Sequence, residues 1–216
     1  MRLQLMMRLF KHAAATSLVL LAAGCASLAP QDVKDNGPAL ERRYSDAIDL
    51  GGRLSVRYEQ NGHEEAVHGS FTWNQSARHV VVTLLSPLGQ TLATIDIKPG
   101  IAVLTQSGKP PMTASDVDIL TEQALGWPLP ISGLRDWLQG FGRGADGKLF
   151  VARPSADTVR FTTRDAWNLS YGEWQDGSAN TAANHPKRID LARETKQAGP
   201  VAIRIVIDSW KAADAQ

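Results

Sequence analysis

Cysteine and an excess of either charge are both scarce in this chain of 216 residues, which holds one cysteine and has a formal net charge of +1. A single cysteine, Cys25, excludes an intramolecular disulfide framework and a zinc site built from cysteines. A nearly neutral chain lacks the basic excess typical of nucleic-acid binding, so we expect no nucleic-acid partner. Hydrophobic residues make up 43% of the chain, which is too many for disorder along its whole length.

Catalytic and metal-binding motifs are also missing. The stretch Gly142–Gly147 spells GxGxxG, but no strand–helix unit surrounds it, and Leu149 stands where a phosphate-binding loop needs Ser or Thr. We therefore expect Gly140–Gly147 to be a glycine-rich surface loop. No HExxH or GxSxG motif occurs, and no ligand spacing is present among His63, His68, His79 and His185. The sequence predicts no enzyme, no metal site and no cofactor.

The chain has no long hydrophobic run either. After a basic start, Ala13–Ala23 is apolar for about a dozen residues, which is too short to span a bilayer. The run ends in Ala22-Ala23-Gly24 directly before Cys25, a pattern typical of a bacterial lipoprotein signal that is cleaved before the cysteine. Ala22 departs from the leucine usually found there. A plain secretory signal with a chance cysteine is the alternative.

These features predict four segments. Residues 1–24 are a removable signal peptide, 25–43 a lipid anchor and flexible tether, 44–211 the folded domain, and 212–216 a polar tail. Acyl chains on Cys25 would hold the chain on a membrane almost irreversibly. Because Ala26 rather than aspartate follows the cysteine, we expect the inner, periplasmic leaflet of the outer membrane.

From Tyr44 onward, apolar and polar residues alternate with the period of two that is typical of half-buried strands. Asn61-Gly62 is a strong hairpin signal. Helical spacing occurs only in the middle, where Ser115 or Asp116 could cap a helix that stops at Gly126, and a second helix follows Pro130. Further strands are predicted at 80–85, 92–97, 101–106, 159–163, 167–171, 188–193 and 201–207.

Two short helices cannot cover a sheet of about ten strands, so the sheet must curl on itself. We predict a mainly antiparallel fold, a half-open curled β-barrel of about ten or eleven strands with a short helical lid and an apolar cavity. A packed sandwich without a cavity fits the pattern equally well. The predicted inward positions are all apolar: Val56, Phe71, Trp73, Leu84, Ile95, Val103, Phe161, Leu169, Ile203 and Ile205.

A leucine stands at a turn where polar residues are usual. Pro87 and Gly89 satisfy the turn's backbone requirements, so Leu88 between them adds nothing local. Such a leucine either folds back onto the core or faces an apolar partner. By the pattern alone, core packing is favoured.

Five segments together resemble the LolB family of outer-membrane lipoproteins. They are Cys25 after its signal, Gly52–Val56, Ser70–Trp73, Leu85–Thr91 and Gly126–Gly140. The resemblance runs in order from the signal to Trp210. It implies a half-open barrel with a helical lid and an acyl-chain cavity, here assigned to Val56, Phe71, Trp73, Leu84, Ile95, Val103, Leu134 and Trp137.

The resemblance also implies a task and partners. The chain would receive acylated lipoproteins from the periplasmic carrier LolA and insert them into outer-membrane lipid, as a monomer and without nucleotide. The matching loop, Pro87-Leu88-Gly89, would serve insertion into the bilayer, which reverses the core-packing reading of Leu88. The alternatives are an interaction lipoprotein of an envelope assembly complex and a lipid-modifying enzyme that depends on His68, His79 or His185.

Overall fold

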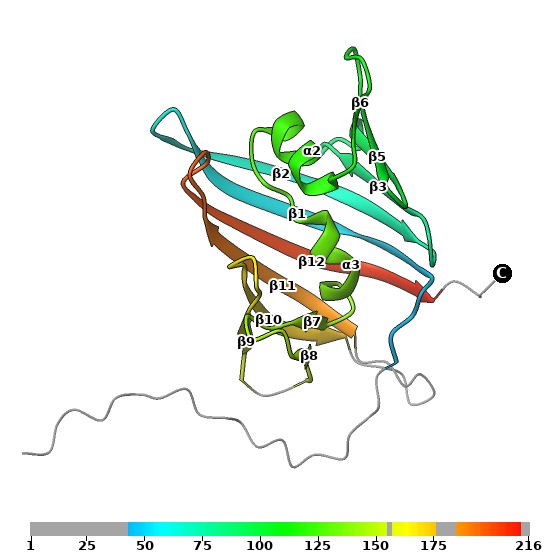
Figure 1. Ribbon diagram of the computed structural model, residues 1–216, viewed down its shortest axis with the longest axis vertical. Coiled ribbons are helices and arrows are strands. Elements are labelled where there is room, and N and C mark those ends of the chain that lie inside the picture. The colour runs from blue at the N-terminus through cyan, green and yellow to red at the C-terminus, as the bar shows by residue number, and fades with distance from the viewer. Residues whose placement is uncertain (1–42, 155–156, 176–184, 213–216) are drawn as a thin grey trace, which may run out of the picture. The chain divides into compact units, whose positions relative to one another are not determined.

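One antiparallel sheet of ten strands dominates the computed structural model, which describes residues 43–154, 157–175 and 185–212 (Figure 1). Its strands are β1 (Ile48–Gln60), β2 (His63–Gln75), β3 (Val80–Leu85), β4 (Thr91–Lys98), β5 (Ile101–Gln106), β6 (Met112–Ala114), β9 (Val159–Thr162), β10 (Asn168–Gln175), β11 (His185–Glu194) and β12 (Pro200–Ala212). Their order is β6-β5-β4-β3-β2-β1-β12-β11-β10-β9. The edge strands β6 and β9 do not pair, so the sheet is curled but open, as predicted.

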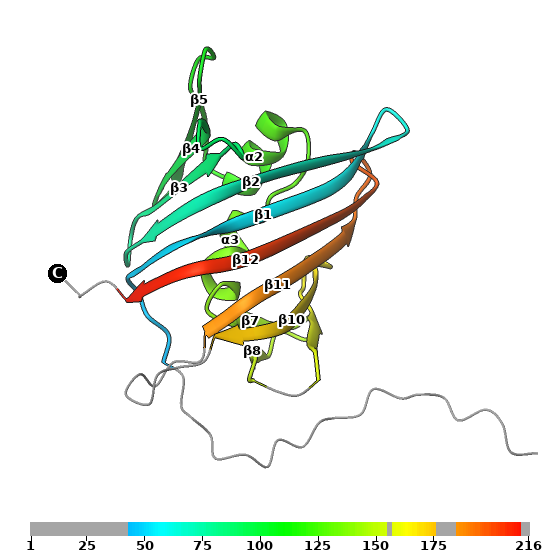
Figure 2. The same cartoon turned by 180° about the vertical axis from the view of Figure 1, so that it is seen from behind.

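Two helices occupy the concave side of the sheet, in front of it in Figure 1 and behind it in Figure 2. They are α2 (Val117–Leu125) and α3 (Ile131–Trp137). The Asp116 carboxylate accepts hydrogen bonds from the first-turn backbone of α2, and Gly126 ends that helix with φ +82°, a conformation that suits glycine. Both helices lie where the sequence predicts them.

Local sequence also explains the bend of the sheet. The β1–β12 register shifts between Gly51 and Gly52, a bulge that bends and twists the strand. A Cβ on Gly52 would lie 2.2 Å from the Val206 carbonyl oxygen and 2.8 Å from the Phe71 ring, so only glycine fits there. The bulge lets β1 curve over the helices.

The prediction of a surface loop at Gly140–Gly147 is only partly right. Phe141–Arg143 (β7) pairs with Leu149–Val151 (β8) in a separate two-stranded sheet, so Gly140–Gly147 is not simply a loop. A strand of three residues is too short to show alternation, which is why the pattern missed both this hairpin and β6. No helix in the described ranges is long and apolar enough to cross a membrane.

Candidate functional site

The concave face of the sheet and the segment through α3 border an interior lined only by apolar side chains. The space left between them is about 20 Å³, room for about one water molecule. Its lining comes from four strands and from the segment that runs through α3: Leu54, Phe71, Trp73, Val82, Leu84, Leu129, Ile131, Leu134, Leu138, Ile203 and Ile205. The interior is therefore chemically suited to an acyl chain but filled in this state.

Most of the predicted cavity residues are buried in this interior. Phe71, Trp73, Leu84 and Leu134 line the space itself, and three more are buried nearby, namely Val56, Ile95 and Trp137. The assignment of Val103 is wrong in its orientation. In β5 the buried residues are Ala102 and Leu104, each 1% exposed. Val103 lies on the opposite face, because a shift of one residue turns a whole strand over.

Polar contacts fix α3 to one end of the sheet. The Arg135 guanidinium donates to the carbonyl oxygens of Ser76 and Ala77, at 3.1 and 2.9 Å. The buried Gln139 side chain accepts from the Ser45 backbone N–H at 2.9 Å and donates to the Ser45 carbonyl at 3.0 Å. The Tyr171 hydroxyl donates to the Trp137 carbonyl at 3.0 Å. These bonds set how deeply the helix sits.

The two helices are also joined to each other. The half-buried Asp118 carboxylate of α2 accepts hydrogen bonds from the backbone N–H and the hydroxyl of Ser132 in α3. Burial raises the pKa of Asp118, while the bonds from Ser132 act in the opposite direction. The Thr121 hydroxyl donates to the Leu129 carbonyl at 3.0 Å. Through these contacts α2 and α3 form one plug.

A second hollow of about 350 Å³ adjoins the filled interior and shares Leu54 and Leu84 with it. Most of its lining is apolar and includes Leu85, Leu92, Leu125 and Trp127, together with Tyr58, Val67, Ala124, Gly69, His68, Gln106 and Lys109. Tyr58 and Trp127, which line this hollow, were not predicted from the sequence as site residues. Their only signals were the alternation in β1 and the unusual Gly126-Trp127-Pro128 sequence.

Leu88 projects from the loop between β3 and β4, close in sequence to two lining residues of this hollow. Its side chain is 88% exposed, so the core-packing interpretation is wrong. The loop is held tightly, because the Ser86 hydroxyl accepts from the backbone N–H groups of Leu88 and Gln90, and Gly89 adopts φ +80°. The turn therefore presents this leucine to solvent in a fixed position.

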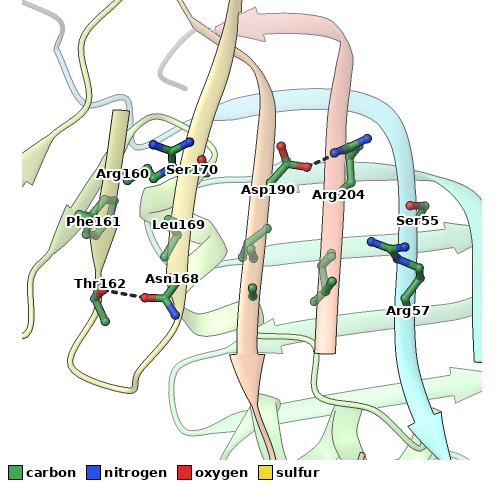
Figure 3. A pocket seen from close by; sticks show the side chains of 14 residues that line it. Ser55, Arg57, Arg160, Phe161, Thr162, Asn168, Leu169, Ser170, Asp190 and Arg204 are labelled. Carbon is green, nitrogen blue, oxygen red and sulfur yellow. Dashed lines mark hydrogen bonds and ion pairs between the residues drawn. The ribbon is translucent and has the colours of Figure 1, made fainter. Parts of the chain in front are cut away.

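A larger hollow, of about 790 Å³, lies on the convex face, and its lining mixes charged and polar groups with apolar ones such as Phe161 and Leu169 (Figure 3). The Arg204 guanidinium donates to Asp190 at 2.5 Å, and the Thr162 hydroxyl donates to Asn168 at 2.7 Å. Acyl chains would gain nothing from these charged and hydrogen-bonded groups. Of the hollows formed by the described residues, the interior on the concave side is the best suited to an apolar ligand, because its lining is apolar throughout.

Two predicted features remain outside this geometry. Cys25 and most of the proposed tether precede the described residues. The described histidines do not form a cluster: His79 contacts Asp96 at 3.0 Å, and His185 stacks on Trp210. Among the described residues no group of three His, Cys, Asp or Glu side chains could hold a metal ion.

This domain belongs to the class of curled, open antiparallel sheets that hold an apolar helical plug on their concave side. Here one leucine is also exposed on a fixed loop. The sequence model of "Outer membrane lipoprotein LolB" matches residues 46–210. The chain therefore belongs to the LolB family.

Curated relatives agree with this assignment over nearly their whole length. The outer-membrane lipoprotein LolB of Cupriavidus pinatubonensis is 42% identical over 198 residues, covering 89% of this chain and 91% of the relative. That of Chromobacterium violaceum is 32% identical and covers 90% and 96%. Among solved structures, a LolA superfamily protein from Nitrosomonas europaea is 10% identical, covers 81% of this chain and 90% of its own, and gives a TM-score of 0.44.

Proposed function

We propose that this chain accepts acylated lipoproteins from the carrier LolA, holds their acyl chains against its concave apolar face and inserts them into the outer membrane. The observation that carries this proposal is the interior lined only by apolar side chains. Each acyl methylene left in water costs about 0.8 kcal/mol. A chain of ordinary length therefore needs such a shelter on its way to the bilayer.

The filled interior implies that cargo opens it. A space of about 20 Å³ cannot take an acyl chain, so the plug formed by α2 and α3 must move away from the sheet. The neighbouring hollow of about 350 Å³ already offers apolar surface beside Trp127 and Leu92, and we assign the entry of the acyl chain to it. Neither step needs a nucleotide.

Transfer is the direct test. A lipoprotein loaded on its carrier is mixed with outer-membrane vesicles that lack their own acceptor, with or without the full-length lipidated chain. We expect cargo to reach the vesicles only when the chain is present. Cargo that stays on the carrier, in the presence of a folded chain, would contradict the proposal.

Leu88→Glu separates insertion from uptake. We expect folding and binding of an acyl-chain fluorophore to stay unchanged while insertion falls, because a carboxylate enters the apolar part of a membrane at a cost of a few kcal/mol. Leu149→Glu is the matched control, since Leu149 is 65% exposed but lies on the separate β7–β8 hairpin. An equal loss of cargo binding in Leu88→Glu would contradict this division of roles.

The alternatives predict different results. An interaction lipoprotein with a permanently packed core would not bind the acyl-chain fluorophore at all. A lipid-modifying enzyme would depend on a histidine, so replacing His68, His79 and His185 together should abolish its activity. We expect that triple variant to transfer cargo at nearly the parent rate, since His79 contacts Asp96 and His185 stacks on Trp210, while His68 lines the entry hollow as an exposed polar side chain that adds no apolar surface.

A further inference from the structure

The β1–β2 hairpin leaves part of one backbone edge without a neighbouring strand. β1 and β2 pair residue by residue up to the two-residue turn Asn61-Gly62. β3 pairs with β2 only over Ser70–Gln75, so the hairpin extends beyond the end of β3, as two views show (Figure 1, Figure 2). Among the described residues, no strand pairs with His63–Gly69 on the side away from β1. This part of β2 is an open strand edge.

The register shows which backbone groups face the open side. In an antiparallel pair, opposite residues alternate between exchanging both hydrogen bonds and exchanging none, and the residues that flank a two-residue turn form a bonded pair. Glu64, Ala66 and His68 therefore direct their N–H and C=O groups away from β1. Glu59, opposite Glu64, agrees with this alternation, because its N–H donates away from β2 to the Ala198 carbonyl at 2.8 Å. All three edge residues are exposed.

The open edge adjoins the hollow of about 350 Å³ on the concave side. Val67, His68 and Gly69 of β2 line that hollow. Leu85 at the end of β3 and Leu92 in β4 line it too. A ligand in the hollow thus lies directly beside the place where a further strand could pair with β2.

The direction of the edge selects one kind of occupant. β2 runs away from the Asn61-Gly62 turn, so a segment that pairs with it antiparallel, as β3 does, runs from the hollow towards that turn. Antiparallel pairing is also slightly the more stable arrangement. A lipoprotein that is cleaved before its acylated cysteine carries its lipid on its first residue. With that lipid in the hollow, its polypeptide follows the edge in the antiparallel direction.

We propose that residues Glu64–His68 bind the extended segment that follows the acylated cysteine of a cargo lipoprotein, adding it as a strand in line with β3. This inference rests on the proposed function and deepens it, because the hollow takes the acyl chain and the edge takes the polypeptide. Main-chain hydrogen bonds do not depend on the side chains of the bound segment, so cargo of many sequences can use one edge. The edge spans about 17 Å, enough to pair with about five residues.

Methylation of the cargo backbone tests the pairing without changing the acyl chains. The probe is a synthetic peptide with diacylglyceryl cysteine first and five alternating Ala and Ser residues after it. It is loaded on the carrier and given to vesicles that hold the full-length lipidated chain. Two versions carry N-methyl groups on alternate residues, either the second and fourth or the third and fifth, and equal loading of the carrier is checked first.

Only one of the two methylated sets can face β2, because the N–H groups of a strand alternate in direction. We expect one version to need a carrier-bound concentration about ten times higher for half-maximal transfer, and the other to behave like the unmethylated peptide. Equal behaviour of the two versions would overturn the proposal.

Ala66→Pro tests the same pairing from the side of the protein. It removes an N–H group that takes no part in the β1–β2 ladder, a position at which proline is tolerated. We expect the half-maximal concentration of the unmethylated peptide to rise about threefold to tenfold, whereas binding of an acyl-chain fluorophore without a peptide should not change. Ala66→Ser keeps the N–H group and is the matched control. Equal transfer by the two folded variants would overturn the proposal, and the methylated peptides decide the question if Ala66→Pro does not fold.

The outcomes separate this proposal from the proposed function. If the parent chain transfers no peptide at all, the acceptor role fails. If it transfers both methylated versions equally well, the acceptor role stands and the edge does not bind the peptide. Ala66→Cys tests a second copy of this chain as the occupant. An interchain disulfide that forms without cargo and persists when cargo is added would overturn the proposal.

Discussion

Neighbouring residues of one strand show how differently the two faces of the sheet are used. In β1, Val56 and Tyr58 are 0% and 8% exposed on the concave face, whereas the polar side chains of Ser55 and Arg57 line the hollow on the convex face. The backbone is shared, so only the side chains differ. The concave face stabilises the fold through tight apolar packing, and the convex face adds ion pairs in water that contribute little. Stability therefore depends mainly on the concave face, which is also the face that the proposed function uses.

The largest expected effect follows from emptying the concave face. Trp73→Ala removes a side chain that is 1% exposed and that donates to Gln75 at 3.0 Å. We expect the free energy of unfolding to fall by about 3–5 kcal/mol. Thr72→Ala, one residue away and exposed on the convex face, should change it by less than about 0.5 kcal/mol. Urea unfolding followed by circular dichroism measures both, and equal effects would contradict the contrast between the faces.

A smaller effect is expected at the polar clasp of α3. Gln139→Leu leaves the Ser45 N–H and carbonyl without their partner, and we expect a loss of about 1–3 kcal/mol in the free energy of unfolding. Gln197→Leu, an exposed glutamine in the β11–β12 turn, is the control. If both substitutions were neutral in urea unfolding, the clasp would not hold the plug.

The ion pair on the convex face should contribute less. A double-mutant cycle with Arg204→Gln and Asp190→Asn isolates the contact of 2.5 Å between the two groups. We expect a coupling energy of about 0.2–1 kcal/mol, decreasing as salt is added. A coupling energy for this ion pair that exceeds the loss measured for Gln139→Leu would reverse the ranking of the two faces.

The pH dependence of two aspartates should have opposite signs. Burial raises the pKa of Asp118 in the plug. The native state thus holds that proton more tightly, and its stabilising contribution, full below about pH 4, is lost as the pH rises through the native pKa. On the convex face, the hydrogen bonds from Arg53 lower the pKa of Asp208, and its contribution is lost as the pH falls.

Urea unfolding of Asp118→Asn and Asp208→Asn between pH 3 and pH 7 checks these signs against the parent chain. The free energy of unfolding of Asp118→Asn, relative to that of the parent chain, should rise as the pH rises. That of Asp208→Asn should fall relative to the parent over the same range. Parallel curves for the two variants would show that the two aspartates do not differ in this way.

Much of the architecture was predictable because it depends on local chemistry. Alternation gave the limits of β3 and β5 as observed, Asp116 and Gly126 marked the ends of α2, and Asn61-Gly62 forms the β1–β2 turn with φ of 54° and 77°. The prediction that Val103 faces the interior was wrong because Ile101 and Val103 are as apolar as Ala102 and Leu104. In such a strand, composition does not tell which face is buried.

The sequence by itself determined the longer strands, the two helices, the curl that so few helices require, and a family resemblance that the comparisons confirm. Tertiary structure alone decided that the interior is filled to about 20 Å³ and that Arg135 reaches the turn at residues 76–77. It also decided that the Tyr44 hydroxyl accepts hydrogen bonds from Gln75 and Arg135, which lie far from it in the chain. These facts depend on contacts between residues far apart in the chain, whose geometry is set only when the whole sheet curls around its helices.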